Sequence, residues 1–262
     1  MQGQKIYASC ALYTIMIEII PAVLPKNYED LKNKIALVRG IVPVVQIDIC
    51  DGIFVPNLTW PFLSVGKRPD LENSKRSGLE ETDLDDHFRK ILNEKEGMPF
   101  WEDIDFELDL LVSDAVENFD IYTKLGAKKI VFHIEAVGNL EEFKNFMEGI
   151  DTYMREMIEI GVAVNIDTPM EQVFPLISNV DFVQCMGINK VGFQEQEFDE
   201  RVIENIKILK GKFPDLIISV DGGIDFNTAP ALSSAGASRL VIGSAIFNTD
   251  DIIGTIEEFR NL

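Results

Sequence analysis

The sequence predicts an α/β fold, a (β/α)₈ TIM barrel, because short apolar runs alternate with helical patterns along nearly the whole chain. Parallel strands joined by helical crossovers produce this alternation. Eight such units in about 250 residues match the size of a (β/α)₈ barrel. A doubly wound open sheet is the alternative, because strand counting from one sequence can err by one or two. The predicted strands, rich in valine and isoleucine, are 17–23, 44–50, 105–112, 129–135, 161–167, 182–188, 216–223 and 239–245.

The first predicted strand lies within an apolar stretch, 7–24, that resembles a signal sequence. Glu18 interrupts this stretch and only Lys5 supplies positive charge ahead of it, which favours a strand behind a short N-terminal extension, residues 1–15. Met16 is an alternative start. No segment reaches about 18 uninterrupted apolar residues, so no membrane span is expected. No linker divides the chain, which predicts a single domain, 1–262.

One segment, 63–103, breaks the alternation. It places about forty residues between the second and third strands, where a typical unit needs roughly half as many. Its mixed charge and one helical stretch, 84–95, predict an insertion at the carboxyl end of strand 2. A flap over the active site and a solvated or partner-binding surface are both open readings. The other helices, with apolar residues recurring at about 3.6 positions, are expected at 28–39, 116–125, 140–160, 202–212 and 228–235.

Composition narrows the class of partner. The formal net charge of −20 argues against nucleic acid and against anionic membrane surfaces. Three cysteines, Cys10, Cys50 and Cys185, form no even framework and no CxxC pair, which indicates a reduced, cytoplasmic setting.

Two aspartates stand out in apolar strands. Asp48 lies inside VVQIDIC and Asp221 near the end of LIISVDGG. A carboxylate in an apolar strand is costly unless it is paired, hydrogen-bonded or bound to metal. In a barrel both would face one another at the mouth, where catalytic groups lie. Two carboxylates on opposite sides of one carbon invert a stereocentre, since one removes a proton α to a carbonyl and the other returns one. For Asp51-Gly52, a structural turn is the competing reading.

Glycine turns follow the last two strands, as Gly222-Gly223 and as Gly243-Ser244. Glycine lets backbone N–H groups approach an anion closely, and barrels often hold a phosphate after strands 7 and 8. Tight turns alone would also explain these glycines. Their position favours a phosphate site.

Together these residues resemble the ribulose-phosphate 3-epimerase family, from about residue 17 to residue 253. The stretches that carry the resemblance are IDICDGIFVPNLTW, FELDLLVSDAVENF, FHIEA, GVAVNIDTP, VGFQEQEF and ISVDGGIDFNTAPALSSAGASRLVIGSAIF. The first and last of these are specific in combination, whereas a lone DGG is weak. The resemblance implies an aspartate acid–base pair, a divalent metal and a phosphate held by glycine-rich loops.

By position, the resemblance places the acid–base pair on Asp48 and Asp221. The family's metal has these two aspartates and two histidines as ligands. The histidine positions are occupied here by Gln46 and Asp109. Three outcomes are therefore open. Asp48, Asp109, Asp221 and the Gln46 carbonyl would form an all-oxygen metal site, suited to Mg²⁺ or Mn²⁺ rather than zinc or iron. Alternatively no metal binds and the Gln46 amide stabilises an enediolate, or the barrel acts on a different phosphorylated ligand.

The implied substrate contacts also differ in part from the family pattern. Ala22 replaces a serine, Cys50 replaces a methionine, and the phosphate loop carries Glu195, an unfavourable neighbour for phosphate unless it points away. His133 either lines the pocket or packs in its strand. The implied phosphate and sugar contacts are Met186, Gly192, Phe193, Gly222, Gly223, Gly243 and Ser244.

The expected function is therefore that of an isomerase that inverts C3 of a ketopentose phosphate through an enediolate. A barrel acting on another phosphosugar, and a non-catalytic phosphosugar-binding relative, are the alternatives, because fold does not imply function. The expected partner is a phosphorylated sugar, and a homo-oligomer is expected.

Overall fold

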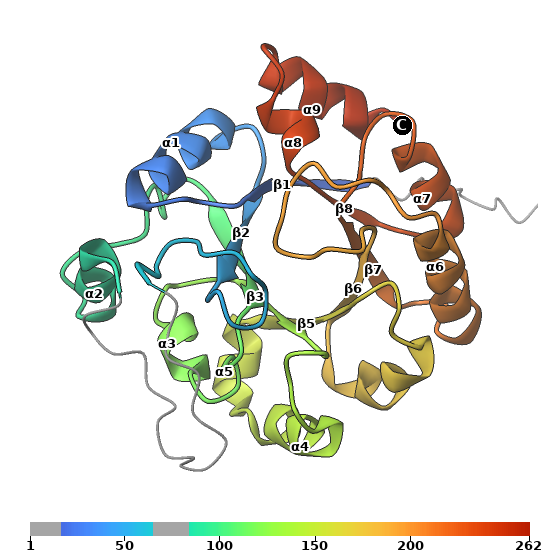
Figure 1. Ribbon diagram of the computed structural model, residues 1–262, viewed down its shortest axis with the longest axis horizontal. Coiled ribbons are helices and arrows are strands. Elements are labelled where there is room, and N and C mark those ends of the chain that lie inside the picture. Colours follow the sequence, from blue (N-terminus) through green and yellow to red (C-terminus); the bar gives the residue numbers. More distant parts are fainter. Residues whose placement is uncertain (1–16, 65–83) are drawn as a thin grey trace, which may run out of the picture.

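A computed structural model describes residues 17–64 and 84–262, and in this part of the chain eight parallel strands form a closed barrel (Figure 1). Each strand pairs with the next, and the eighth pairs with the first. The closed barrel confirms the predicted TIM barrel over the open sheet. The strands are β1 Glu18–Val23, β2 Val44–Cys50, β3 Asp105–Leu111, β4 Lys129–His133, β5 Glu159–Val164, β6 Phe182–Met186, β7 Ile217–Asp221 and β8 Arg239–Ile242.

Helices surround the barrel as an outer ring (Figure 1). They bury one apolar face against the outward-facing strand residues, as Leu31, Ile35 and Val38 of α1 do. Two short 3₁₀ helices, Met170–Gln172 and Phe174–Asn179, lie between β5 and β6. The α-helices are α1 Tyr28–Val38, α2 Asp86–Leu92, α3 Phe119–Thr123, α4 Leu140–Gly149, α5 Thr152–Met157, α6 Arg201–Lys212, α7 Ala229–Ala235, α8 Ser244–Phe247 and α9 Ile252–Arg260.

The single helix predicted over 140–160 is wrong. Ile150 is extended at the end of α4, and the Asp151 side chain then accepts from the backbone N–H of Tyr153 to cap α5. This cap begins a new helix, because a side-chain acceptor satisfies N–H groups that have no partner inside the helix. Strand β5 starts at Glu159, two residues earlier than predicted. The predicted strands 7 and 8 also ran too far, since β7 ends at Asp221 and β8 at Ile242.

The described part of the insertion contains α2, the helix that connects β2 to β3, and does not form a flap. Helix α2 lies in the outer ring beyond β2 (Figure 1) and buries Phe88 and Ile91. Asp85 caps it by accepting from the backbone N–H of His87, and also accepts from the Trp60 indole at 3.1 Å. The remainder of the predicted insertion, 65–83, and the predicted extension, 1–15, lie outside the described residues.

A buried ion pair crosses the barrel interior near the amino ends of the strands. Arg239 on β8 donates from Nη2 to Glu107 on β3, and from Nε to Glu18 on β1 at 2.9 Å. Its guanidinium lies 4.3 Å from the centroid of the Phe182 ring. Glu107 is fully buried and Arg239 is 4% exposed, so each charge depends on the other for stabilisation.

Across residues 17–64 and 84–262, no helix combines the length and the apolar composition needed to cross a membrane.

Replacing Arg239 with methionine should lower the free energy of unfolding by about 3 kcal/mol or more, because Glu107 is left buried without its partner. Urea denaturation measures this loss. The double variant Glu107→Leu/Arg239→Met should recover most of it, since apolar replacement of a buried pair is often near neutral. A double variant no more stable than Arg239→Met alone would contradict the role assigned to this pair.

Candidate functional site

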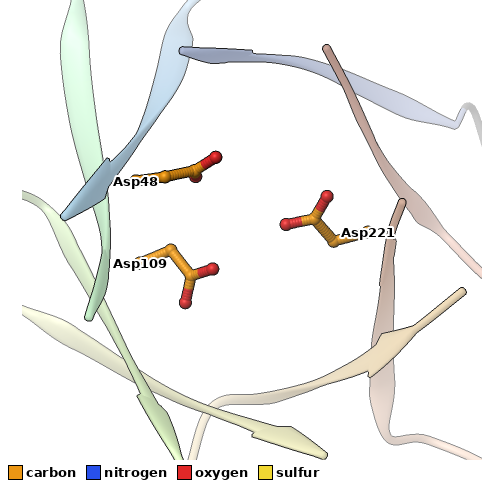
Figure 2. A group of neighbouring side chains, drawn as sticks. All are labelled: Asp48, Asp109 and Asp221. Atoms are coloured by element: carbon orange, nitrogen blue, oxygen red, sulfur yellow. The ribbon is translucent and has the colours of Figure 1, made fainter. Parts of the chain in front are cut away.

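Three aspartates lie together at the carboxyl end of the barrel interior (Figure 2). Asp48 comes from β2, Asp109 from β3 and Asp221 from β7. The register of β2 and β3 places Asp48 beside Asp109. Closure of the barrel brings Asp221 across from both, as Figure 2 shows. One carboxylate oxygen from each aspartate lies within 4.8 Å of the others.

Gln46 bridges the two aspartates from opposite sides of the barrel. It is fully buried, two residues before Asp48, so both side chains point inward. Its Nε2 donates to Asp48 Oδ1 and to Asp221 Oδ2, each at 2.8 Å. Its Oε1 is buried without a partner in the described structure. Both N–H groups of this amide are therefore used by carboxylates.

A second carboxamide reaches the same carboxylate. Gln184 on β6 is fully buried, and its Nε2 lies 3.3 Å from Asp221 Oδ2. Gln184 was not among the site residues predicted from the sequence. The available signal was a polar side chain in the middle of the apolar strand FVQCM, the same kind of signal that identified Asp48.

His133 reaches the site through Asp109. Its Nε2 lies 3.0 Å from Asp109 Oδ1, and both residues are almost completely buried. Burial alone would lower the pKa of His133, but the adjacent carboxylate of Asp109 outweighs it and the pKa is raised. A raised pKa favours the imidazolium, which gives Asp109 a positive partner.

Burial and repulsion act together on the two proposed acid–base residues. Burial, with the charge of Asp109 as the second cause, raises the pKa of Asp48 to about 8. Burial, followed by the charges of Asp48 and Asp109, raises the pKa of Asp221 well above its ordinary value. The hydrogen bonds from Gln46 oppose both shifts. Neighbouring carboxylates of this kind hold a proton between them near neutral pH.

One cavity joins the aspartates to the glycine turns. Gly222 and Gly223 have φ values of +99° and +68°, which glycine adopts without strain. A Cβ on Gly223 would lie 2.7 Å from the Phe198 Cα, so this turn also needs glycine for space. All of the sequence-predicted site residues except Gln46 line this cavity: Asp48, Asp109, Met186, Gly192, Phe193, Asp221, Gly222, Gly223, Gly243 and Ser244.

The loop after β2 lies over the barrel mouth and contacts the loop after β6. Asn57 donates from Nδ2 to the Gly192 carbonyl at 2.6 Å, and Val55 packs so closely on Gly192 that an added Cβ would lie 2.7 Å from it. Asp51 fixes the start of this loop, because one oxygen accepts from the N–H groups of Ile53 and Phe54 and the other from Ser113. Asp51 therefore has the structural role that its Asp-Gly pair indicated.

The loop after β6 places three polar residues at the cavity: Gln194, Glu195 and Gln196. Gln194, which the sequence analysis also missed, lies with its Nε2 3.4 Å from the Ala22 carbonyl and directly over Gly243. Glu195 is exposed, and its Oε1 accepts from Asn248 Nδ2 at 2.9 Å. This bond holds the acidic side chain toward Asn248 at the rim of the cavity.

The donor set fits a hard divalent cation. Three carboxylates converge, and oxygen ligands of this type suit Mg²⁺ or Mn²⁺. Gln46 lies beside them with its amide nitrogen toward Asp48 and Asp221, and an amide N–H is not a metal ligand. The fit therefore depends on the carboxylates and not on Gln46.

Solved structures share this barrel at low sequence identity. A structure of KGPDC from Streptococcus mutans matches with a TM-score of 0.62 and 13% identity, over 94% of this chain and 96% of that chain. A 3-hexulose-6-phosphate synthase from Salmonella typhimurium matches with a TM-score of 0.59 and 13% identity, over 94% and 97% of the two chains. These similarities support the fold alone.

Sequence comparison goes further. A Bacillus subtilis (strain 168) protein named ribulose-phosphate 3-epimerase is 28% identical over 253 residues, which cover 94% of this chain and 99% of that protein. The cytoplasmic isoform from Oryza sativa subsp. japonica is 29% identical over 233 residues, covering 88% and 87%. The model of the ribulose-phosphate 3-epimerase family matches residues 91–247, more than half of the chain. With the barrel and its aspartate cluster in place, this match shows that the chain belongs to the ribulose-phosphate 3-epimerase family.

Proposed function

We propose that this protein is an epimerase that inverts C3 of a ketopentose phosphate, with Asp48 and Asp221 as the two proton-transfer groups. The observation that carries the proposal is the placement of these carboxylates across one cavity, on β2 and β7. Membership of the family and the names of its relatives support the same reaction class.

The protonation of the pair suits the reaction. Inversion needs one ionised carboxylate and one protonated carboxyl group at the start of each turnover. The raised pKa values of Asp48 and Asp221 favour such a mixed state near neutral pH, because burial and repulsion oppose a second negative charge. The reverse reaction uses the same two groups with their roles exchanged.

The proton transfers balance as follows. The ionised aspartate takes the C3 proton, the C–H electron pair forms the C2–C3 double bond, and the carbonyl electrons move to oxygen. The protonated aspartate then delivers its proton to the opposite face of C3, and the carbonyl is restored. One proton has left and one has been added, so the product differs only in configuration.

The glycine turns support a phosphate at the other end of the cavity. Gly222, Gly223 and Gly243 line it without side chains, so the backbone is free to approach an anion. Phosphate held there would fix the distance from the anion to C3. This anchoring supports phosphorylated sugars as substrates rather than free sugars.

The three carboxylates also support a divalent cation, and we favour Mg²⁺ or Mn²⁺ over zinc or iron because all the candidate ligand atoms are oxygen. A bound cation would supply positive charge to stabilise the enediolate oxygens. Gln46 is a poor candidate for that role as it lies, because both of its N–H groups already donate to Asp48 and Asp221.

The acid–base assignment predicts the effect of two substitutions. Asp48→Asn and Asp221→Asn should each slow epimerisation of ribulose 5-phosphate by about 10² or more, since inversion needs both carboxyl groups and an amide cannot carry the proton. Only the variant that lacks the base for this epimer should also lose exchange of its C3 proton with deuterium oxide. Proton NMR measures both reactions.

A matched control is Asp114→Asn, since Asp114 is a partly buried aspartate that follows β3 outside the cavity lining. It should epimerise the substrate at the wild-type rate. Full epimerisation by Asp48→Asn, with circular dichroism and thermal unfolding like those of the wild type, would show that the assignment is wrong.

The cation proposal makes a separate prediction. Mn²⁺ should bind to metal-free protein with a stoichiometry near one, and Asp109→Asn should weaken binding by about tenfold or more, because it replaces one of three charged ligands. Electron paramagnetic resonance of free Mn²⁺ measures both. Asp120→Asn, at an exposed position of α3, is the control and should leave the affinity unchanged. Unchanged affinity in Asp109→Asn would remove that residue from the ligand set.

A further inference from the structure

Two carboxamides from different sides of the barrel converge on the catalytic carboxylates. Gln46 on β2 donates to Asp48 Oδ1 and Asp221 Oδ2, and Gln184 on β6 lies 3.3 Å from the same Asp221 oxygen. Both glutamines are fully buried. Each amide presents its nitrogen to the aspartate oxygens, and both Oε1 atoms are left buried without partners in the described structure.

These two unpartnered oxygens indicate that the arrangement of the glutamines lowers the stability of the fold. A buried carbonyl oxygen without a donor destabilises a fold. A leucine or methionine would fill either position without leaving such an atom. The contacts that the glutamines do make are all with Asp48 and Asp221, so these contacts account for the presence of amides.

We propose that Gln46 and Gln184 form a carboxamide clamp whose role is to assign the proton-transferring oxygen of each catalytic aspartate. The inference rests on the proposed function, because it takes Asp48 and Asp221 as the acid and the base. Within the described residues, no hydrogen bond reaches Asp48 Oδ2 or Asp221 Oδ1, while the other oxygen of each is held by an amide. The free oxygens therefore move the proton, and the held oxygens fix the planes of the carboxylates.

The clamp leaves the proposed cation possible. A carboxylate oxygen has more than one lone pair, so an oxygen that accepts from an amide can still ligate a metal. Gln46 and Gln184 are neutral and do not titrate, so they hold the aspartates without changing the charge of the cluster. They are positioning residues, because they act on the substrate only through Asp48 and Asp221.

Gln46 and Gln184 contact different numbers of aspartates, and this difference allows the role of the clamp to be tested. Gln46 holds both aspartates, whereas Gln184 holds only Asp221. Loss of Gln184 should therefore impair the proton transfer made by Asp221, which is the abstraction step for one epimer only. Loss of Gln46 should impair abstraction from both epimers.

The experiment measures the primary isotope effect on kcat with each C3-deuterated epimer, for the full chain and the near-isosteric variants Gln184→Met and Gln46→Met. Gln184→Met should lower kcat by about tenfold, because a small misplacement of a reacting group is costly. Its isotope effect should rise for one epimer and not for the other, with KM little changed. Gln46→Met should raise the isotope effect for both epimers.

Ser219→Ala is the matched control. Ser219 pairs in register with Gln184 on the adjacent strand, is fully buried, and has an Oγ without a partner among the described residues, but it donates to neither aspartate. Its isotope effects should equal those of the wild type. An isotope effect does not depend on the fraction of folded enzyme, so a partly unfolded variant still gives a valid result. If Gln184→Met folds poorly, Gln184→Asn, whose shorter amide cannot reach Asp221, should give the same one-sided pattern.

The outcomes separate the two proposals. An active wild type whose isotope effects are unchanged in Gln184→Met, or raised equally for both epimers, would overturn the clamp and leave the proposed function standing. A wild type that binds ribulose 5-phosphate in a thermal-shift assay but exchanges no C3 proton would overturn the proposed function, and the clamp's role with it. A one-sided rise in Gln184→Met together with a two-sided rise in Gln46→Met supports the clamp.

Discussion

The crowding of three carboxylates inside the barrel is the constraint on which the rest of the site depends. Asp48, Asp109 and Asp221 each place a carboxylate oxygen within 4.8 Å of the others, so their negative charges repel one another. Neighbouring side chains compensate this repulsion: Gln46 donates to Asp48 and Asp221, and His133 lies against Asp109. Burial, followed by the repulsion that remains, raises the pKa values of Asp48 and Asp221, and raised pKa values are what a two-base proton transfer near neutral pH requires. The aspartate cluster therefore destabilises the folded protein but favours proton transfer.

The barrel accommodates this cluster by separating two environments. Apolar side chains fill the space between strands and helices, whereas the inward-facing positions combine polar groups with apolar residues such as Ile20 and Val131. Glu107 lies two residues before Asp109 on β3, and its charge is paired there with that of Arg239 on β8. The glycine turns and the loop from Asp51 to Asn57 then shape the opening. Rigid strands below and adaptable loops above are a common division of labour in this fold.

Much of this could be predicted from local sequence, and the remainder could not for an identifiable reason. Strands appear as apolar runs, and Asp48 is visible because it interrupts one. Helix boundaries were less predictable, since the Asp151 cap divides a stretch with continuous helical periodicity. The bridge from Gln46 to Asp221 spans 175 residues of sequence, and the Glu107–Arg239 pair spans 132, so both exist only after the barrel closes. Gln184 was detectable as a polar residue in an apolar strand, but its partner was not.

The central claim is that Asp48 and Asp221 lie on opposite faces of one substrate carbon. A crystal structure with bound ribulose 5-phosphate tests it most directly. The account predicts C3 between the two carboxylates, with one oxygen of each about 3–3.5 Å from it on opposite faces, and the phosphate at the turns of Gly222 and Gly243. A sugar whose C3 contacts neither aspartate, or has both on the same face, would contradict the account.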